Sequence, residues 1–312
     1  MRDARQQQKA IPTFLKILTD LELRAMTFNK DTKILIIGLG VMGGSYAKAL
    51  SDKGYTVKCI TKETADVRYG MEHQMISYGT TEVEPELVKE AELIVFALYP
   101  AAFIEWIEKY QHLFSPGAII TDVTGVKSEV VYKVQDILRN DVEYIAAHPM
   151  AGRERSGVEF ADPTVFNGAN YIVTPTDKNS LGAIKLCKAL GEELGFLRIS
   201  ELSPEAHDQM IAFLSQLTHI IAVTLMNCND SDGLEKYTGD SFRDLTRIAK
   251  INDRMWSELF LMNKDALIAE MDRFIEEFNE FRGYLANEDG KRMREKMRSS
   301  SARRTLFDKP AK

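Results

Sequence analysis

Short apolar runs alternate with amphipathic segments along the first two thirds of the chain. Continuous runs rich in β-branched residues predict buried strands, and apolar residues at helical spacing predict helices. The expected strands lie at 34–37, 56–60, 93–98, 118–122 and 144–147, with helices at 43–53, 103–113 and 127–138. Strict alternation of strand and helix indicates crossover connections. We therefore predict an α/β fold of the Rossmann type, a doubly wound and mainly parallel sheet covered on both faces.

The pattern changes near residue 201. A strand, a helix and a strand expected at 168–174, 180–194 and 196–199 extend the sheet. After them, residues 204–286 read as long amphipathic helices. The chain is thus divided into an N-terminal extension (1–31), an α/β domain (32–201), an all-helical domain (202–287) and a basic tail (288–312).

The composition is that of an ordinary globular protein. The 312 residues include 46 acidic and 40 basic side chains, which gives a formal charge of −6, and 45% are apolar. Nucleic-acid binding depends on a surplus of Lys and Arg, so we expect no nucleic-acid partner. The three cysteines, Cys59, Cys187 and Cys228, lie far apart without metal-binding or disulfide spacing, so we expect no metal site.

No segment predicts membrane attachment. The first residues contain no apolar core of signal-peptide length, and 11–25 is expected to be a short amphipathic helix. An uncharged stretch at 209–229 contains His219 and other polar side chains, and it is expected to be a buried helix of the helical domain. We therefore expect a cytoplasmic protein without a membrane partner.

A glycine-rich turn follows the first expected strand. Its glycines have G-x-G-x-x-G spacing between an apolar strand and a helix. In this context they allow a tight turn, close approach of a pyrophosphate, and phosphate binding at the helix N-terminus. A glycine-rich turn without a ligand is the alternative. The residues expected to bind the dinucleotide are Gly38, Gly40, Val41, Met42 and Gly43.

The end of the second expected strand bears on the choice of cofactor. NAD-specific sites usually place an acidic residue there to bind the ribose hydroxyls. Here the strand ends in Thr61 and Lys62, which suit the additional phosphate of NADP by hydrogen bond and by charge. We expect NAD(P) with a preference for NADP. The alternative is that Lys62 is solvated and Glu63 reaches the ribose of NAD.

Two polar segments, 121–127 and 148–157, follow later strands. Ligands of open parallel sheets bind beyond the carboxyl ends of the strands, so both segments are expected to line the same cleft as the glycine turn. His148 stands at one of these strand ends, and a neutral imidazole is a suitable proton acceptor near neutral pH. His148 is therefore our candidate general base.

The helical half contains weaker signals. His207 and His219 lie roughly on one face of one expected helix. Arg243 and Arg247 are close together, and Trp256 follows them. An arginine presents a planar fork that binds a carboxylate at two points, although a solvated or ion-paired arginine is the more common case.

The order of these motifs resembles that of the prephenate/arogenate dehydrogenase family of tyrosine biosynthesis. The similarity covers about residues 33–284 and includes GLGVMGGS, ALYP, TDVTGVK, AHPMAGRERSG, GANYIVTP, a His-Asp pair at His207 with a second histidine after it, and FRDLTRIA followed by Trp256. The family combines a nucleotide-binding domain with an all-helical domain that forms the dimer. The resemblance therefore implies a homodimer that acts on a small-molecule substrate.

The resemblance also implies roles for single residues. His148 matches the catalytic histidine that hydrogen-bonds the ring hydroxyl of the substrate, and Arg247 matches the arginine that binds the ring carboxylate. Four further residues match positions that line or gate the substrate pocket, namely His219, Trp256, Glu154 and Lys127.

One loop departs from the family pattern. Where the family commonly has Gly-Ser, this chain has Thr124-Gly125, so the serine that orients the catalytic histidine is missing from its usual place. Thr124 is our candidate to replace it in catalysis. Gln216 also stands where many members have a histidine.

The implied reaction is the oxidative decarboxylation of prephenate to 4-hydroxyphenylpyruvate. Hydride leaves the hydroxyl-bearing ring carbon for NAD(P), His148 takes up the hydroxyl proton, and carbon dioxide departs as the ring becomes aromatic. Arogenate, which carries an amino acid side chain, is the alternative substrate. A catalytically silent dinucleotide-binding sensor is the alternative from another class, but the presence of His148 and Arg247 argues against it.

Overall fold

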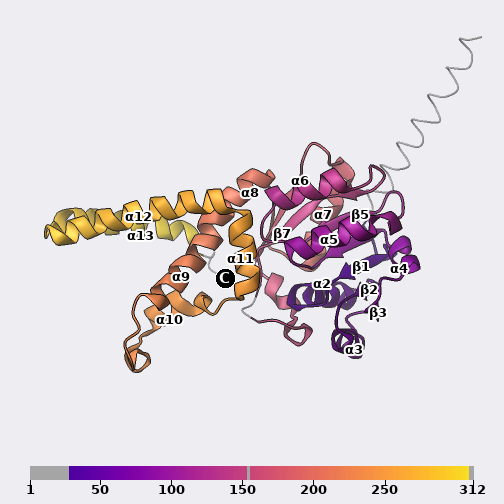
Figure 1. The fold of residues 1–312 in the computed structure, drawn as a ribbon, viewed down its shortest axis with the longest axis horizontal. Coiled ribbons are helices and arrows are strands. Elements are labelled where there is room, and N and C mark those ends of the chain that lie inside the picture. Colours follow the sequence, from indigo (N-terminus) through magenta and orange to yellow (C-terminus); the bar gives the residue numbers. More distant parts are fainter. Residues whose placement is uncertain (1–27, 153–154, 309–312) are drawn as a thin grey trace, which may run out of the picture.

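The computed structural model describes residues 28–152 and 155–308. The helix expected at 11–25 and the candidate Glu154 lie outside the described residues. A sheet covered by helices forms one part of the molecule, and a set of long helices extends away from it (Figure 1). The last strand ends at Glu201 and the first helix of the second part begins at Pro204, so the architecture changes between these two residues.

The first part is built on a six-stranded sheet in which every neighbouring pair is parallel. The strand order is β3-β2-β1-β4-β5-β6, so the direction of winding reverses between β1 and β4, where ligands of such sheets bind. This confirms the predicted fold class. The strands are β1 (Ile34–Ile37), β2 (Val57–Ile60), β3 (Tyr78–Thr80), β4 (Leu93–Phe96), β5 (Ile119–Asp122) and β6 (Glu143–Tyr144).

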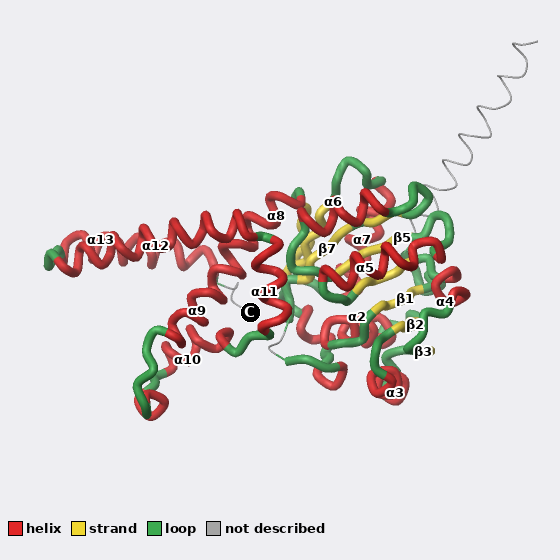
Figure 2. The backbone as a smooth tube through the Cα atoms, in the orientation of Figure 1, coloured by secondary structure: helices red, strands yellow, loops and turns green. Residues whose placement is uncertain are grey.

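Helices cover both faces of this sheet (Figure 2). In β1, Ile34 and Ile36 pack in one buried cluster, and Leu35 and Ile37 pack in the other. Because neither face meets water, the strand reads as a continuous apolar run instead of an alternating one. The helices are α2 (Val41–Asp52), α3 (Thr64–Glu72), α4 (Pro85–Glu90), α5 (Pro100–Tyr110), α6 (Ser128–Ile137) and α7 (Leu181–Leu194).

The remaining strands differ from the prediction. They form a separate sheet of three strands, β7 (Ala146–Pro149), β8 (Asn170–Thr174) and β9 (Arg198–Glu201). Only Ile145 separates β7 from β6. The link from β7 to β8 has short 3₁₀ turns in its described part and no crossover helix there, so the two strands pair antiparallel; β8 and β9, joined through α7, are parallel.

The second part consists of helices. One continuous helix contains α8 (Pro204–Ile211), a π-helical turn (Ala212–Leu217) and α9 (Thr218–Asn227). By length and apolar composition alone, Pro204–Asn227 could span a membrane, a test that core helices of soluble proteins also pass. The helices that follow are α10 (Asp240–Thr246), α11 (Asp253–Met262), α12 (Lys264–Ala286) and α13 (Gly290–Arg304).

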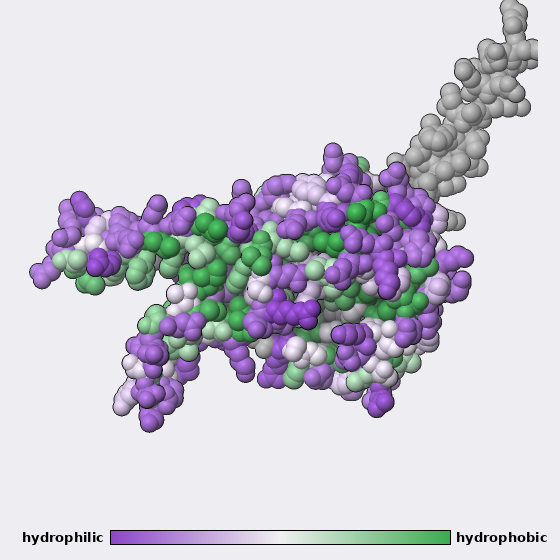
Figure 3. Space-filling model, viewed as in Figure 1, coloured by the Kyte–Doolittle hydropathy of each residue, from purple (hydrophilic) through white to green (hydrophobic). Residues whose placement is uncertain are grey.

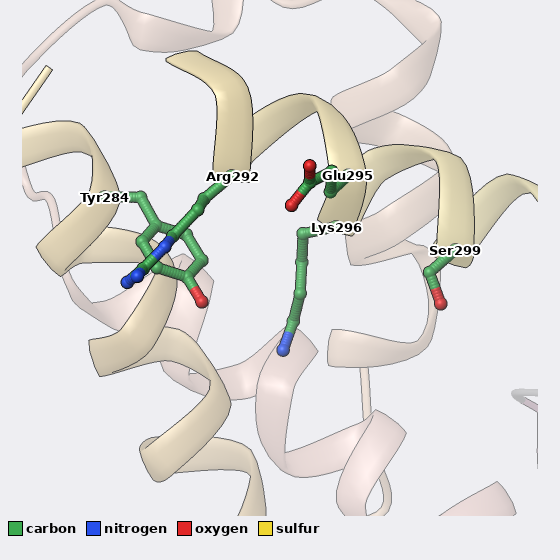
Figure 4. A pocket seen from close by; sticks show the side chains of 5 residues that line it. All are labelled: Tyr284, Arg292, Glu295, Lys296 and Ser299. Carbon is green, nitrogen blue, oxygen red and sulfur yellow. The ribbon is translucent and has the colours of Figure 1, made fainter. Parts of the chain in front are cut away.

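The expectation of a basic tail after residue 287 needs correction. Residues 290–304 form α13, which packs along α12 as a projecting hairpin (Figure 1). Lys296 forms ion pairs with Glu277 at 2.5 Å and Glu280 at 2.6 Å. The Arg292 guanidinium lies over the Tyr284 ring, and these side chains border a polar hollow between the two helices (Figure 4). The described contacts of α13 with α12 thus include charged side chains, on a helix without buried residues.

Candidate active site

The glycine turn fits a dinucleotide. Gly38 has a φ of +96°, and a Cβ on Gly43 would lie 2.0 Å from the carbonyl oxygen of Gly38, so glycine is required at both positions. A Cβ on Gly40 would meet no described atom within 4 Å, which leaves open space beside the turn. None of the described side chains caps α2, which begins at Val41. The N–H groups of Val41 and Met42 in its first turn therefore point to where a phosphate can bind.

The end of β2 differs in part from the sequence expectation. Thr61 is buried, and its hydroxyl oxygen accepts a hydrogen bond from the Leu39 N–H at 3.2 Å, so this side chain supports the glycine turn. Lys62 is exposed. Burial and the charges of Glu159 and Glu63 raise the pKa of Asp66 in the first turn of α3, so this end of the sheet contains acidic groups as well as Lys62.

The loop after β5 contains a buried charge network. The Lys127 ammonium is fully buried and donates hydrogen bonds to Asp122 Oδ2 at 2.7 Å, the Ala147 carbonyl at 2.5 Å and Thr124 Oγ1 at 3.2 Å. Burial lowers the pKa of Lys127, and the Asp122 carboxylate opposes this effect. Tyr144 donates to the other oxygen of Asp122 at 2.9 Å. The network joins the carboxyl end of β5 to β7 from inside the protein.

Two proposed roles change as a result. Lys127 was expected to contact the substrate, but its ammonium is directed into the interior and is saturated there. Thr124 was expected to take part in catalysis, but its buried hydroxyl lies against the Asp122 carboxylate and the Val126 carbonyl. We therefore assign both side chains to the support of the loop, and neither to the reaction.

His148 lies at the junction of the two parts of the molecule. Its Nδ1 is 2.8 Å from Nε2 of His207 on α8, and His207 Nδ1 is 2.8 Å from Oδ1 of Asp208. Burial lowers the pKa of His148 well below its usual range, and the proximity of His207 and Lys127 lowers it further. His148 is therefore a neutral imidazole near neutral pH, which is the form that accepts a proton.

Asp208 joins the two parts. Its oxygens accept hydrogen bonds from the backbone N–H groups of Lys127 at 2.8 Å and Ser128 at 2.7 Å, so a carboxylate of α8 caps the N-terminus of α6. Burial raises the pKa of Asp208, but the hydrogen bonds from His207 and Ser128 outweigh it and bring the pKa below its usual value. Asp208 is therefore a carboxylate that accepts and does not donate.

Helix α11 closes the other side of the site. A Cβ added to Gly125 would lie 3.4 Å from Leu259 Cδ1 on α11 and 3.8 Å from His148 Nε2. The Nε2 side of His148 thus faces the space beside Gly125, away from α8. On the same helix, Trp256 packs on His219 with ring centroids 3.8 Å apart. Helix α11 thus contacts the Gly125 loop of the first part through Leu259 and His219 of the second part through Trp256.

Arg247 lies in the 3₁₀ turn Arg247–Ala249, which packs against α9, the helix of His219. Its side chain is exposed. Arg243 instead donates to the Thr238 carbonyl at 2.9 Å and to Asp240 at 2.6 Å, so it stabilises its own turn. Arg247 thus lies in a turn packed on the helix that carries His219, and it remains our candidate for binding the carboxylate of the substrate.

The π-helical turn lies between His207 and His219. It has more residues per turn than an α-helix, so it changes the angular relation of side chains before and after it. Within this turn, the buried Gln216 donates to the Leu259 carbonyl at 3.0 Å and accepts from Asn263 at 2.8 Å. Sequence reasoning placed both histidines on one helix but missed the contact of His207 with His148. The adjacent His-Asp pair was the available signal.

Comparison with known proteins supports a specific family. Residues 46–198 match the nucleotide-binding domain of prephenate dehydrogenases, and residues 203–299 match their dimerization domain. The prephenate dehydrogenase of Bacillus subtilis (strain 168) is 31% identical over 276 residues, which are 85% of this chain and 72% of that protein. The chain belongs to the prephenate dehydrogenase family. This family member is therefore an oxidoreductase with an NAD(P)-binding domain, as the sequence predicts.

Other relatives agree. The cyclohexadienyl dehydrogenase of Zymomonas mobilis is 31% identical over 87% of this family member and 94% of its own length. A crystal structure of Aquifex aeolicus prephenate dehydrogenase with hydroxyphenyl propionate and NAD+ is 28% identical, with a TM-score of 0.83 over 90% of this chain and 100% of that one. Synechocystis arogenate dehydrogenase, at 22% identity and a TM-score of 0.76, shares the fold.

Proposed function

We propose that this protein is a prephenate dehydrogenase that converts prephenate to 4-hydroxyphenylpyruvate and carbon dioxide with NAD(P) as hydride acceptor. The observation that carries the proposal is the position of His148, which is neutral, bonded through Nδ1 to His207, and has Nε2 on the side of the Gly125 loop. Curated relatives from Bacillus subtilis and Lactococcus lactis are prephenate dehydrogenases at 31% and 30% identity. A silent dinucleotide-binding protein would have no use for such a base.

Each side chain of the site has a separate role in this reaction. The glycine turn and the first turn of α2 would hold NAD(P), which would supply the acceptor for the hydride of the hydroxyl-bearing ring carbon. His148 accepts the hydroxyl proton at Nε2, and Arg247 binds the ring carboxylate as a charge-assisted pair. His219 and Trp256 pack against one another and form a wall for the ring. Formation of the aromatic ring drives the reaction, so the protein mainly positions groups and removes one proton. Glu154 remains a predicted gating residue.

A rate assay in four combinations tests this function. Purified protein is mixed with prephenate or arogenate and with NAD or NADP, and reduced nicotinamide is followed by absorbance. We expect turnover with prephenate. Preference for arogenate would replace the proposed substrate with its amino analogue, and no turnover with either substrate would support the silent sensor.

We also propose a preference for NADP. Lys62 is exposed at the end of β2, and a lysine there attracts the phosphate that distinguishes NADP. Solvent and salt weaken such a contact, so the expected preference is about tenfold in kcat/KM, or about 1.4 kcal/mol. Lys62→Ala should remove it, whereas Lys53→Ala, at the far end of α2, should not. A wild-type protein that favours NAD would contradict this proposal and indicate Glu63 as the ribose ligand.

Arg247→Ala is expected to weaken substrate binding. A hydrogen-bonded charge pair is worth about 1.5–3 kcal/mol, which corresponds to a KM for prephenate about 10- to 150-fold higher. Initial-rate measurements over a range of prephenate concentrations give this KM, with the KM for the cofactor as an internal control. Arg243→Ala is the matched variant, since Arg243 bonds its own turn. A KM that rises only in Arg243→Ala would move the carboxylate site to that residue.

We propose that the protein is a homodimer formed through its helical part. Large apolar side chains are exposed there, and they gather over α9, α11 and the lower side of α12 (Figure 3). An exposed patch of this kind marks an interface. The residues are Phe213, Leu214, Met226, Leu261, Ile268, Phe274, Ile275 and Phe278. Analytical ultracentrifugation at micromolar concentration should give the mass of two chains, and a monomer would contradict the proposal. We expect this dimer in the cytoplasm, without nucleic acid or membrane.

A further inference from the structure

His148 is held by a second histidine and a carboxylate from the other part of the molecule. We infer that His207 and Asp208 form a positioning pair, which fixes the His148 ring with Nε2 toward the substrate and takes up the positive charge formed during proton transfer. This inference rests on the proposed function for its kinetic part. Its structural part, the protonation pattern of the three side chains, can be tested without a substrate.

The hydrogen-bond chain allows one arrangement of protons. Asp208 is ionised and can only accept, so His207 must donate to it from Nδ1 at 2.8 Å. Burial lowers the pKa of His207, so this ring is neutral and its Nε2 carries no proton. His148 must then donate from Nδ1 to His207 Nε2 at 2.8 Å. A neutral His148 with its proton on Nδ1 has an unprotonated Nε2, which is the atom on the Gly125 side of the ring.

No other described side chain can fix the ring in this way. Thr124 is turned toward Asp122 and Val126, and Gly125, which lies beside Nε2, has no side chain. Among residues 28–152 and 155–308, His207 is thus the side chain that orients His148 by a hydrogen bond. Its own orientation is fixed in turn, because two backbone N–H groups, at Lys127 and Ser128, hold the Asp208 carboxylate.

The same chain of hydrogen bonds also lets the positive charge move from His148 to His207. When the substrate O–H bond breaks, an N–H bond forms at His148 Nε2. The Nδ1–H bond of His148 can then break as an N–H bond forms at His207 Nε2. The positive charge now lies on His207, directly against the Asp208 carboxylate, and His148 is neutral again. One proton enters and none is lost, so the step balances without a further reactant.

Two substitutions of His207 separate these effects. In His207→Asn, the amide lies near the former Nδ1 and keeps a bond to Asp208, but it does not reach His148. In His207→Gln, the amide oxygen can accept from His148 Nδ1, but the side chain cannot take up a proton. We expect kcat for prephenate to fall about 100-fold in His207→Asn and about tenfold in His207→Gln, with KM within about threefold of wild type, because a base in the wrong tautomer loses most of its effect.

A spectroscopic readout tests the pair without substrate or cofactor. The chain has five histidines, so selective ¹⁵N labelling gives a spectrum that single His→Asn variants can assign. We expect His148 and His207 to be protonated at Nδ1 in the wild type, and His148 to become a mixture of tautomers in His207→Asn. His112→Asn, on the exposed 3₁₀ turn after α5, is the control that should change neither tautomer nor rate.

The acidic limb of the pH profile of kcat/KM gives a third readout. This limb reports protonation of His148, which faces His207 and Lys127. We expect the pH at which kcat/KM declines to change in His207→Asn and to stay the same in His112→Asn. A wild-type His148 protonated at Nε2, or a kcat in His207→Asn within about threefold of wild type, would overturn the inference. If His207→Asn does not fold, the kcat of His207→Gln and the wild-type spectrum test the inference instead. Absence of prephenate turnover in the wild type would instead refute the proposed function, and the spectrum would still test the pair.

Discussion

Replacing His148 by Asn is expected to lower kcat for prephenate by about 10²- to 10⁴-fold, the usual contribution of a positioned general base. Asn cannot accept the proton at Nε2, but it is smaller than His and leaves the glycine turn untouched. Binding of the cofactor, measured by fluorescence titration, should therefore stay within about twofold of wild type. A turnover within about threefold of wild type would show that another group takes the proton. His112→Asn again serves as the control.

The pH dependence follows from the same residue. Burial, His207 and Lys127 hold the pKa of His148 well below its usual range, and the neutral imidazole is the active form. Protonation therefore inactivates the enzyme only when the pH falls below this lowered pKa. We expect kcat/KM to stay constant as the pH falls from 8 through about 6.5, the ordinary pKa of histidine, and to decline below it. A decline centred at or above the ordinary pKa would contradict the position assigned to His148.

Replacing Lys127 by Met is expected to reduce the free energy of unfolding by about 3–5 kcal/mol, because it leaves the Asp122 carboxylate buried without its counter-charge. Methionine keeps most of the volume of the lysine side chain, so the loss reports the ion pair more than a cavity. Urea unfolding followed by circular dichroism, at one fixed protein concentration, measures the difference.

Lys133→Met on α6 is the matched control. Lys133 pairs with Glu108 at 3.6 Å, but both side chains are about half exposed, and such pairs contribute about 0–1 kcal/mol. Equal decreases in the free energy of unfolding for the two variants would show that the buried network does not stabilise the loop. A supporting role for Lys127 predicts two results for Lys127→Met. The free energy of unfolding falls strongly, and the folded variant keeps the wild-type KM for prephenate.

The parts of the fold that were predicted correctly are those whose signal is local. The apolar run of β1 and the glycine turn after it each lie within a few residues, and their meaning depends on neighbours in sequence. The strand β3 and the helices α3 and α4 were missed, since they are short and only partly buried. Few buried positions leave little periodicity to detect.

The contacts of the site, by contrast, join residues that are far apart in the sequence. His148 and His207 are 59 residues apart and belong to different parts of the molecule, so the local His-Asp pair marks His207 as a candidate but does not indicate its contact with His148. The sequence indicates Lys127 as a pocket residue at the start of a helix, because its burial depends on how β5 and β7 lie side by side. α13 was missed because its charged residues show no apolar stripe. Tertiary contacts decide all three cases, and local sequence patterns do not contain them.

The cap that Asp208 forms on α6 also limits how ligands can enter and leave. Swinging the helical part away at residues 202–203 would strip the Lys127 and Ser128 N–H groups of their acceptor and expose a buried carboxylate, at a cost of several kcal/mol. Substrate exchange is therefore expected to use motions that leave this joint intact. The amide hydrogens of Lys127 and Ser128 should then exchange slowly with solvent even during turnover, and rapid exchange would point to a hinge at this joint.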